Sequence, residues 1–149
     1  MLYRVLLVLS ALLFLAAPTS ANEPTYPPSE IAPAVMATSI SNPRLVSGVL
    51  TGGQPSRDDL EALRDAGFDT VINLRPESEL GYDEAAAATE LGLRYISIPV
   101  HGAAGVTFEN AALLDAALED SDRPLVHCGS GNRVGGLFAL RAFEAEQIS

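Results

Sequence analysis

One stretch near the end of the chain constrains its fold more than any other. The stretch reads Pro124-Leu125-Val126-His127-Cys128-Gly129-Ser130-Gly131-Asn132-Arg133-Val134-Gly135-Gly136. The residues from Pro124 to His127 predict a short buried strand, and the glycines after Cys128 predict a tight loop. A helix is expected to begin near Asn132. A strand, a loop and the first turn of a helix therefore follow one another without a spacer.

The loop carries residue types that suit the binding of an anion next to a nucleophile. It opens on Cys128, the only cysteine of the chain, and closes on Arg133. Glycines between them let successive backbone N–H groups point at one spot, and the helix N-terminus adds positive charge there. A thiol in this position should have a lowered pKa, and a guanidinium matches two oxygens of a tetrahedral oxyanion. The predicted anion cradle consists of Gly129, Ser130, Gly131, Asn132 and Arg133. The alternative is a buried structural cysteine, which would not require the glycines and the arginine as well.

From Arg44 onward, short apolar runs alternate with amphipathic runs. Strands are predicted over 45–50, 70–74, 93–98 and 124–127. Helices are predicted over 56–67, 83–91, 108–119 and 132–147, and the third of them should bury Phe108, Ala111, Leu114 and Leu118. This alternation indicates an α/β fold of three layers, α/β/α, with a mostly parallel four-stranded sheet.

Ligands of such sheets bind beyond the carboxyl ends of the strands. The polar residues expected at those ends are Gln54, Asn73, Arg75, His101, Cys128 and Arg133. Gln54 and Asn73 are interpreted as groups that brace loops. Arg75 could contact a substrate or pair with a nearby carboxylate, Glu77, Glu79 or Asp83. His127, which precedes the cysteine on a buried strand, is expected to orient the loop through hydrogen bonds.

The N-terminus has the pattern of an export signal. Residues 1–21 combine Arg4, an apolar run and a small-residue cleavage site, and the run is short for a membrane span. We predict a signal peptide over 1–21, a flexible leader over 22–43 and one domain over 44–149. The protein is then exported, periplasmic or secreted, and is not inserted in the membrane after cleavage. One unpaired cysteine cannot form a disulfide within its own chain, so it is either inert or retained for its reactivity.

The chain is acidic, with 9 basic and 19 acidic residues and no lysine. Nucleic acid is therefore excluded as an expected partner, since there is no basic patch to bind it. Any anionic ligand must be captured locally, by backbone N–H groups and a few arginines. His101, His127 and Cys128 lack the spacing of metal ligands, so no metal is predicted.

The sequence resembles the cysteine-dependent protein tyrosine and dual-specificity phosphatases. It is most similar to a bacterial branch of that superfamily, the phosphatase-like domain of beta-lactamase-hydrolase-like proteins. The pieces that carry the resemblance are Gly52-Gly53-Gln54-Pro55-Ser56, Val71-Ile72-Asn73-Leu74-Arg75-Pro76, Tyr95-Ile96-Ser97-Ile98-Pro99-Val100 and His127-Cys128-Gly129-Ser130-Gly131-Asn132-Arg133. They occur in that family's order.

The resemblance implies hydrolysis of a phosphorylated substrate through a phosphocysteine intermediate, without a metal or another cofactor. It implies that Cys128 is the nucleophile, that Arg133 clamps the phosphate and that the N–H groups of residues 129–133 complete the cradle. Such phosphatases protonate the leaving group from an acidic residue after the third strand. The corresponding loop here offers His101, and Glu109 is the next candidate.

Two departures keep other functions open. Ordinary tyrosine phosphatases place five residues between the cysteine and the arginine, whereas this chain places four. They also tend to follow the arginine with Ser or Thr, where this chain has Val134. The shorter loop resembles that of rhodanese-type sulfurtransferases, which would carry a persulfide on Cys128. A module that binds an anion without turnover is the third possibility. The substrate's identity and the oligomeric state are not predicted.

Overall fold

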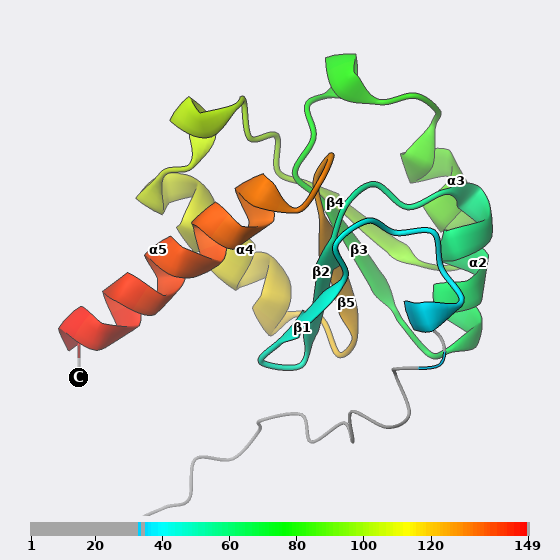
Figure 1. Ribbon diagram of the computed structural model, residues 1–149, viewed down its shortest axis with the longest axis horizontal. Coiled ribbons are helices and arrows are strands. Elements are labelled where there is room, and N and C mark those ends of the chain that lie inside the picture. The colour runs from blue at the N-terminus through cyan, green and yellow to red at the C-terminus, as the bar shows by residue number, and fades with distance from the viewer. Residues whose placement is uncertain (1–32, 34, 149) are drawn as a thin grey trace, which may run out of the picture.

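The computed structural model describes residue 33 and residues 35–148 (Figure 1). The predicted signal peptide and the first part of the predicted leader lie outside the described residues. The elements, in chain order, are β1 (Arg44–Val46), β2 (Val49–Gly52), α2 (Arg57–Asp65), β3 (Thr70–Asn73), the 3-10 helix η1 (Glu77–Glu79), α3 (Glu84–Glu90), β4 (Arg94–Ser97), the 3-10 helix η2 (Ala103–Gly105), α4 (Phe108–Glu119), β5 (Pro124–His127) and α5 (Asn132–Ile148).

The strands form one sheet in the order β1-β2-β5-β3-β4. The strands β2, β5, β3 and β4 run parallel, and β1 is antiparallel to β2. The last strand of the chain, β5, therefore lies between β2 and β3 in the middle of the sheet. The residue that follows β5 is Cys128, so the centre of the carboxyl edge of the sheet carries the only cysteine.

Helices cover both faces of the sheet, which confirms the predicted three-layer α/β fold (Figure 1). Neighbouring residues of a strand point to opposite faces. In β5, Leu125 packs into the core under α2 and α3, whereas Val126 packs into the core under α4 and α5. Val71 and Ile72 of β3 divide between the two cores in the same way. Both cores are apolar, and they fix the sheet from both sides.

The sheet has five strands rather than the predicted four, because the expected strand over 45–50 is a hairpin. Its two turn residues have positive φ, 49° at Ser47 and 82° at Gly48. A two-residue turn of this kind reverses the chain and suits the twist of the two strands that it joins. The edge strand β1 thus pairs with β2, with Arg44 opposite Thr51.

One predicted core residue lies on the surface. Phe108, the first residue of α4, is 46% exposed and contacts Phe143 of α5, with 6.2 Å between the ring centroids. Ala111 and Leu114, one and two turns further along α4, are buried as predicted. Phe108 therefore packs at the surface between α4 and α5 rather than in the core.

The end of the predicted leader is part of the packed structure. Ile40 is buried in the core under α2 and α3. The backbone N–H and the hydroxyl of Ser39 both donate to the Asp59 carboxylate, each at 2.7 Å. The backbone carbonyl of Ser41 accepts a bond from the N–H of Gly53. The packed region therefore begins before residue 44. Among the described residues, no helix combines the length and the apolarity that crossing a membrane requires.

Candidate active site

The carboxyl end of β5 is held by strands on both sides. His127 pairs with Gly52 of β2 and with Asn73 of β3. The Cys128 N–H donates to the carbonyl of Gly52 at 3.3 Å, and the N–H of Leu74 donates to the carbonyl of His127 at 2.9 Å. The position of Cys128 is therefore set by two neighbouring strands, as the convergence of strand ends predicted.

The loop after Cys128 curls back over its own sulfur. Gly131 has a φ of 93°, which an L-residue with a side chain rarely adopts, and its N–H donates to the Cys128 Sγ at 3.1 Å. Gly129 does not have a positive φ. The Arg133 guanidinium lies next to it, because a Cβ added at Gly129 would be in ordinary contact with Nη2, at 3.7 Å.

The environment of Cys128 favours the thiolate. The residue is 1% exposed, and this burial alone would raise the pKa of the thiol. The backbone N–H groups that surround the sulfur outweigh burial, so the Cys128 pKa lies below its ordinary value. These N–H groups belong to Val134, Ser130, Arg133 and Gly131. Because donors from the loop and from the first turn of α5 converge on the sulfur, the loop can bind an anion at this point.

The Arg133 guanidinium is held from its outer side. Nη1 donates to Glu79 Oε1 at 3.1 Å and to the Val100 carbonyl at 2.8 Å, and Nη2 donates to Glu79 Oε2 at 2.6 Å. Both hydrogens of Nη1 and one hydrogen of Nη2 are thereby used. The other edge, formed by Nε–H and the second Nη2–H, is used by neither Glu79 nor Val100. Arg133 also interacts with the Cys128 sulfur, so it can bind two oxygens of a ligand held at that sulfur. Glu79 therefore fixes the orientation of Arg133, a pairing that the sequence does not predict.

The polar residues at the neighbouring strand ends brace one another. The side-chain oxygen of Asn73, Oδ1, accepts a bond from the backbone N–H of Arg75, and the side-chain nitrogen, Nδ2, donates to the Tyr95 hydroxyl, both at 2.7 Å. Arg75 donates to the side-chain oxygen of Gln54 at 2.5 Å and to the backbone carbonyl of Glu79. Its Nε lies 3.7 Å from Glu79 Oε2. Of the two roles considered for Arg75, the structure shows the pairing with Glu79.

His127 points to the face of the sheet that α3 covers. Its Nε2 lies 2.8 Å from Oε1 of Glu84, and both side chains are fully buried. Its Nδ1 lies 3.4 Å from the carbonyl oxygen of Cys128. This contact with the loop fits the orienting role that the sequence predicted. Glu84 is a second residue that sequence reasoning missed, since an acidic residue in an alanine-rich helix gives no sign of burial.

The two candidates for the general acid are both exposed. His101 lies on the loop after β4, next to Val100, whose carbonyl contacts Arg133. Its loop packs on α5, where a Cβ on Gly136 would lie 2.8 Å from Val106. Glu109 lies in the first turn of α4. The loop of His101 thus reaches the rim of the cradle, and the catalytic role of His101 stays a prediction.

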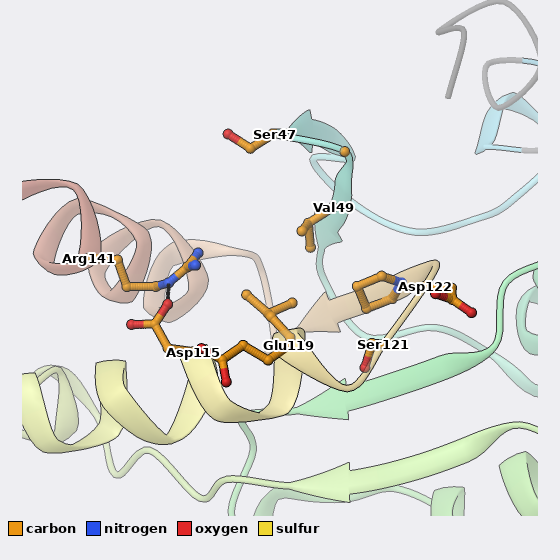
Figure 2. Close-up of a pocket in the computed structure, with 10 residues that line it drawn as sticks. Ser47, Val49, Asp115, Glu119, Ser121, Asp122 and Arg141 are labelled. Carbon is orange, nitrogen blue, oxygen red and sulfur yellow. Dashed lines mark hydrogen bonds and ion pairs between the residues drawn. The ribbon is translucent and has the colours of Figure 1, made fainter. Parts of the chain in front are cut away.

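A hollow lies away from this site (Figure 2). Its volume is about 590 Å³, and it is found where β2 and β5 begin, between Val49, Pro124 and the Arg141–Asp115 ion pair. None of the predicted site residues lines it. Over the described part of the chain, no three His, Cys, Asp or Glu side chains are grouped so that they could hold a metal ion.

Comparisons with known proteins agree with this geometry. A family model described as "DSP-PTPase phosphatase fused to NAD+ Kinase" matches residues 36–141. The chain is 38% identical over 93 residues to a beta-lactamase hydrolase-like protein of Xylella fastidiosa, strain Temecula1. That match covers 59% of this chain and 22% of the relative, so the chain corresponds to about a fifth of the relative's length.

Solved structures share the fold. A protein of Shewanella putrefaciens CN-32, described as a candidate phosphatase (DUF442), superposes with a TM-score of 0.61 at 27% identity, over 72% of this chain and 71% of that chain. A candidate phosphatase of Neisseria meningitidis Z2491 superposes with a TM-score of 0.59 at 20% identity, over 67% and 75% of the two chains. The resemblance inferred from the motifs is confirmed, and the chain belongs to the DSP-PTPase family of phosphatases that the matching model describes.

Proposed function

We propose that this protein is an exported phosphatase that hydrolyses phosphomonoesters through a phosphocysteine intermediate on Cys128. The observation that carries the proposal is the convergence of backbone N–H groups and one edge of Arg133 on a buried sulfur. Such a site stabilises negative charge that spreads over phosphoryl oxygens in the transition state. The substrate is a phosphorylated molecule whose identity the site leaves open.

In the first step, the Cys128 thiolate attacks phosphorus in line with the leaving oxygen. A sulfur–phosphorus bond forms as the phosphorus–oxygen bond breaks, and the leaving oxygen takes a proton, for which His101 is the candidate donor. Water then attacks the phosphorus and gives up a proton, for which the deprotonated His101 is the candidate acceptor. The sulfur–phosphorus bond breaks, its electron pair returns to sulfur, and inorganic phosphate is released. In both steps the loop N–H groups and the inner edge of Arg133 hold the oxygens that do not react.

The test is an assay of the purified protein with para-nitrophenyl phosphate and, in parallel, with thiosulfate plus cyanide. We expect phosphate release that is lost in Cys128→Ser and falls strongly in Arg133→Ala. Thiocyanate production that needs Cys128, without phosphate release, would show a sulfurtransferase and refute the proposal. Protection of Cys128 from alkylation by phosphate, without turnover of either substrate, would show a module that only binds anions.

Export is a separate part of the proposal and rests on residues 1–21 alone. Expression of the full chain in a bacterial host, followed by fractionation and measurement of the mature mass, tests it. A periplasmic protein that begins near Asn22 is the expected result. A cytoplasmic protein of full mass would refute export and leave the phosphatase proposal untouched.

A further inference from the structure

The least expected pair in the core lies directly beneath the cradle. Glu84 and His127 are both 0% exposed, although an ionisable side chain is rarely buried completely. Glu84 is the first residue of α3. Asp83 caps the N-terminus of that helix, because its carboxylate accepts a bond from the N–H of Ala86 at 2.9 Å. His127 is the last residue of the central strand. The pair therefore joins α3 to the residue that precedes Cys128.

The surroundings of Glu84 leave His127 as its partner. Among the described residues, His127 is the only basic side chain that pairs with Glu84, and neither Glu84 oxygen has a well-aligned hydrogen bond. The nearby tyrosines, Tyr82 and Tyr95, are neutral near pH 7, as tyrosines ordinarily are. Burial is the largest cause that raises the pKa of each further, and the charge of Glu84 adds to it. The other charged groups that act on these tyrosines are the carboxylates of Asp59 and Asp83.

A buried pair of this kind is a poor way to stabilise a fold. Replacing a buried ion pair by apolar residues of similar volume is often neutral or stabilising. The position of Glu84 on an otherwise apolar face of α3, beside Ala87 and Ala88 in the core, would accept an apolar residue. The Glu84–His127 pair lies one residue from the candidate nucleophile. Its cost is better explained by an effect on Cys128 than by a contribution to stability.

The geometry of the imidazole shows what that effect is. The Cys128 carbonyl oxygen, 3.4 Å from Nδ1, can only accept a hydrogen bond, so the favourable tautomer carries a hydrogen on Nδ1. Nε2 and Glu84 Oε1 lie 2.8 Å apart as an ion pair, although neither atom has a well-aligned hydrogen bond. A ring that is charged beside the carboxylate carries a hydrogen on both nitrogens, so this pairing keeps Nδ1–H toward Cys128. Without Glu84, the ring is free to move its hydrogen to Nε2, and the Nδ1 lone pair would face the carbonyl.

We propose that Glu84 is a positioning residue, which keeps His127 in the form with a hydrogen on Nδ1 and so holds the Cys128 backbone and its loop in the arrangement that stabilises the thiolate. The inference rests on the proposed function, in which the thiolate is the nucleophile. Its tests, however, measure the histidine ring and the reactivity of the thiol, and neither needs a substrate. Failure of this inference is thus distinguishable from failure of the phosphatase proposal.

The first measurement uses the unmutated protein. Nitrogen-15 NMR of the imidazole rings reports which ring nitrogen carries hydrogen, and the chain has only two histidines, so His101→Ala assigns the signals. At neutral pH we expect hydrogen on Nδ1 of His127. A ring with hydrogen on Nε2 alone would overturn the proposal whatever the variants do.

The second measurement is alkylation of Cys128 by iodoacetamide as a function of pH. Glu84→Leu should move the midpoint upward, toward the value of about 8.5 for a free cysteine. Glu84→Gln should stay near the unmutated protein, because its amide can donate to Nε2 and keep the hydrogen on Nδ1. The matched control is Glu90→Gln in the same helix, whose carboxylate is exposed and pairs with Arg57.

Circular dichroism shows which variants are folded. A folded Glu84→Leu with an unchanged midpoint would refute the positioning role. A Glu84→Gln variant that shifts the midpoint as far as Glu84→Leu would also refute it, since charge rather than the ring tautomer would then be responsible. If Glu84→Leu does not fold, the glutamine variant and the NMR measurement decide the question by themselves.

Discussion

The clearest single test of the cradle is Gly131→Ala. Gly131 has a φ of 93°, and an L-residue in the left-handed region costs roughly 1–2 kcal/mol. Space is not the obstacle, because an added Cβ would lie 3.7 Å from the backbone of Gly52, an ordinary contact. The substitution therefore places conformational strain alone on the residue whose N–H donates to the Cys128 Sγ.

The loop can respond to this strain in two ways, and both are measurable. If it keeps its shape, the free energy of unfolding falls by about 1–2 kcal/mol. If it relaxes, the N–H bond to the sulfur is lost. A hydrogen bond to a charged group contributes about 1.5–3 kcal/mol. Its loss would therefore raise the Cys128 pKa toward the ordinary value of a thiol. Urea unfolding measures the first response, and alkylation against pH measures the second.

The matched control is Gly135→Ala, one helical turn later in α5. Gly135 has no positive φ, and an added Cβ would meet nothing within 4 Å. Alanine should stabilise this helical position by about 0.5–1 kcal/mol. The change in the free energy of unfolding is therefore expected to have opposite signs in Gly131→Ala and Gly135→Ala. If Gly131→Ala changed neither the unfolding free energy nor the alkylation midpoint, the left-handed conformation of Gly131 would not be needed for the loop to bond the sulfur.

Two further changes test contacts around the site. Glu79→Gln should weaken the protection of Cys128 by phosphate about two- to fivefold, the usual effect of an exposed ion pair, because Arg133 loses its bidentate partner. Glu77→Gln is the control. Equal protection of Cys128 in both variants would count against the role of Glu79. Asp59→Asn should lower the free energy of unfolding at pH 7 by about 1–3 kcal/mol. Burial raises the Asp59 pKa, but hydrogen bonds from the helix cap and from Ser39 outweigh it and lower the pKa below the unfolded value near ~3.9. This stabilisation is therefore complete above about pH 4 and is lost as the pH falls through the folded pKa. An unfolding curve of Asp59→Asn with the same acid dependence as the unmutated protein would contradict this assignment.

The sequence predicted the parts of the structure that neighbouring residues determine. Alternating apolar runs gave the order of strands and helices, and the spacing around Cys128 gave the loop, because a strand, a loop and a helix start are contiguous there. The hairpin at Ser47 and Gly48 was missed because a run of apolar residues on both sides of Ser-Gly looks like one strand. Its turn depends on two positive φ angles, 49° and 82°.

The parts that the sequence did not predict are contacts between distant segments. Glu79 and Arg133 are 54 residues apart, and Glu84 is likewise distant from His127. Neither acidic residue has a local pattern that separates it from the exposed carboxylates around it. Only the order of strands, with β5 between β2 and β3, brings η1 and the start of α3, which carry them, to the end of the last strand.

This arrangement also explains how an acidic chain can hold an anion. The net charge is −10, so the protein as a whole repels the ligand that its loop is built to bind. Binding must then come from short-range groups, and these are present: converging N–H groups at Cys128 and a guanidinium whose outer edge is already neutralised by Glu79. Because Glu79 uses one edge of Arg133 and leaves the other, the carboxylate orients the positive charge without occupying the cradle. The acidic residues nearest the site are therefore part of it. Glu79 orients Arg133, and Glu84 positions His127, the buried histidine next to the thiolate.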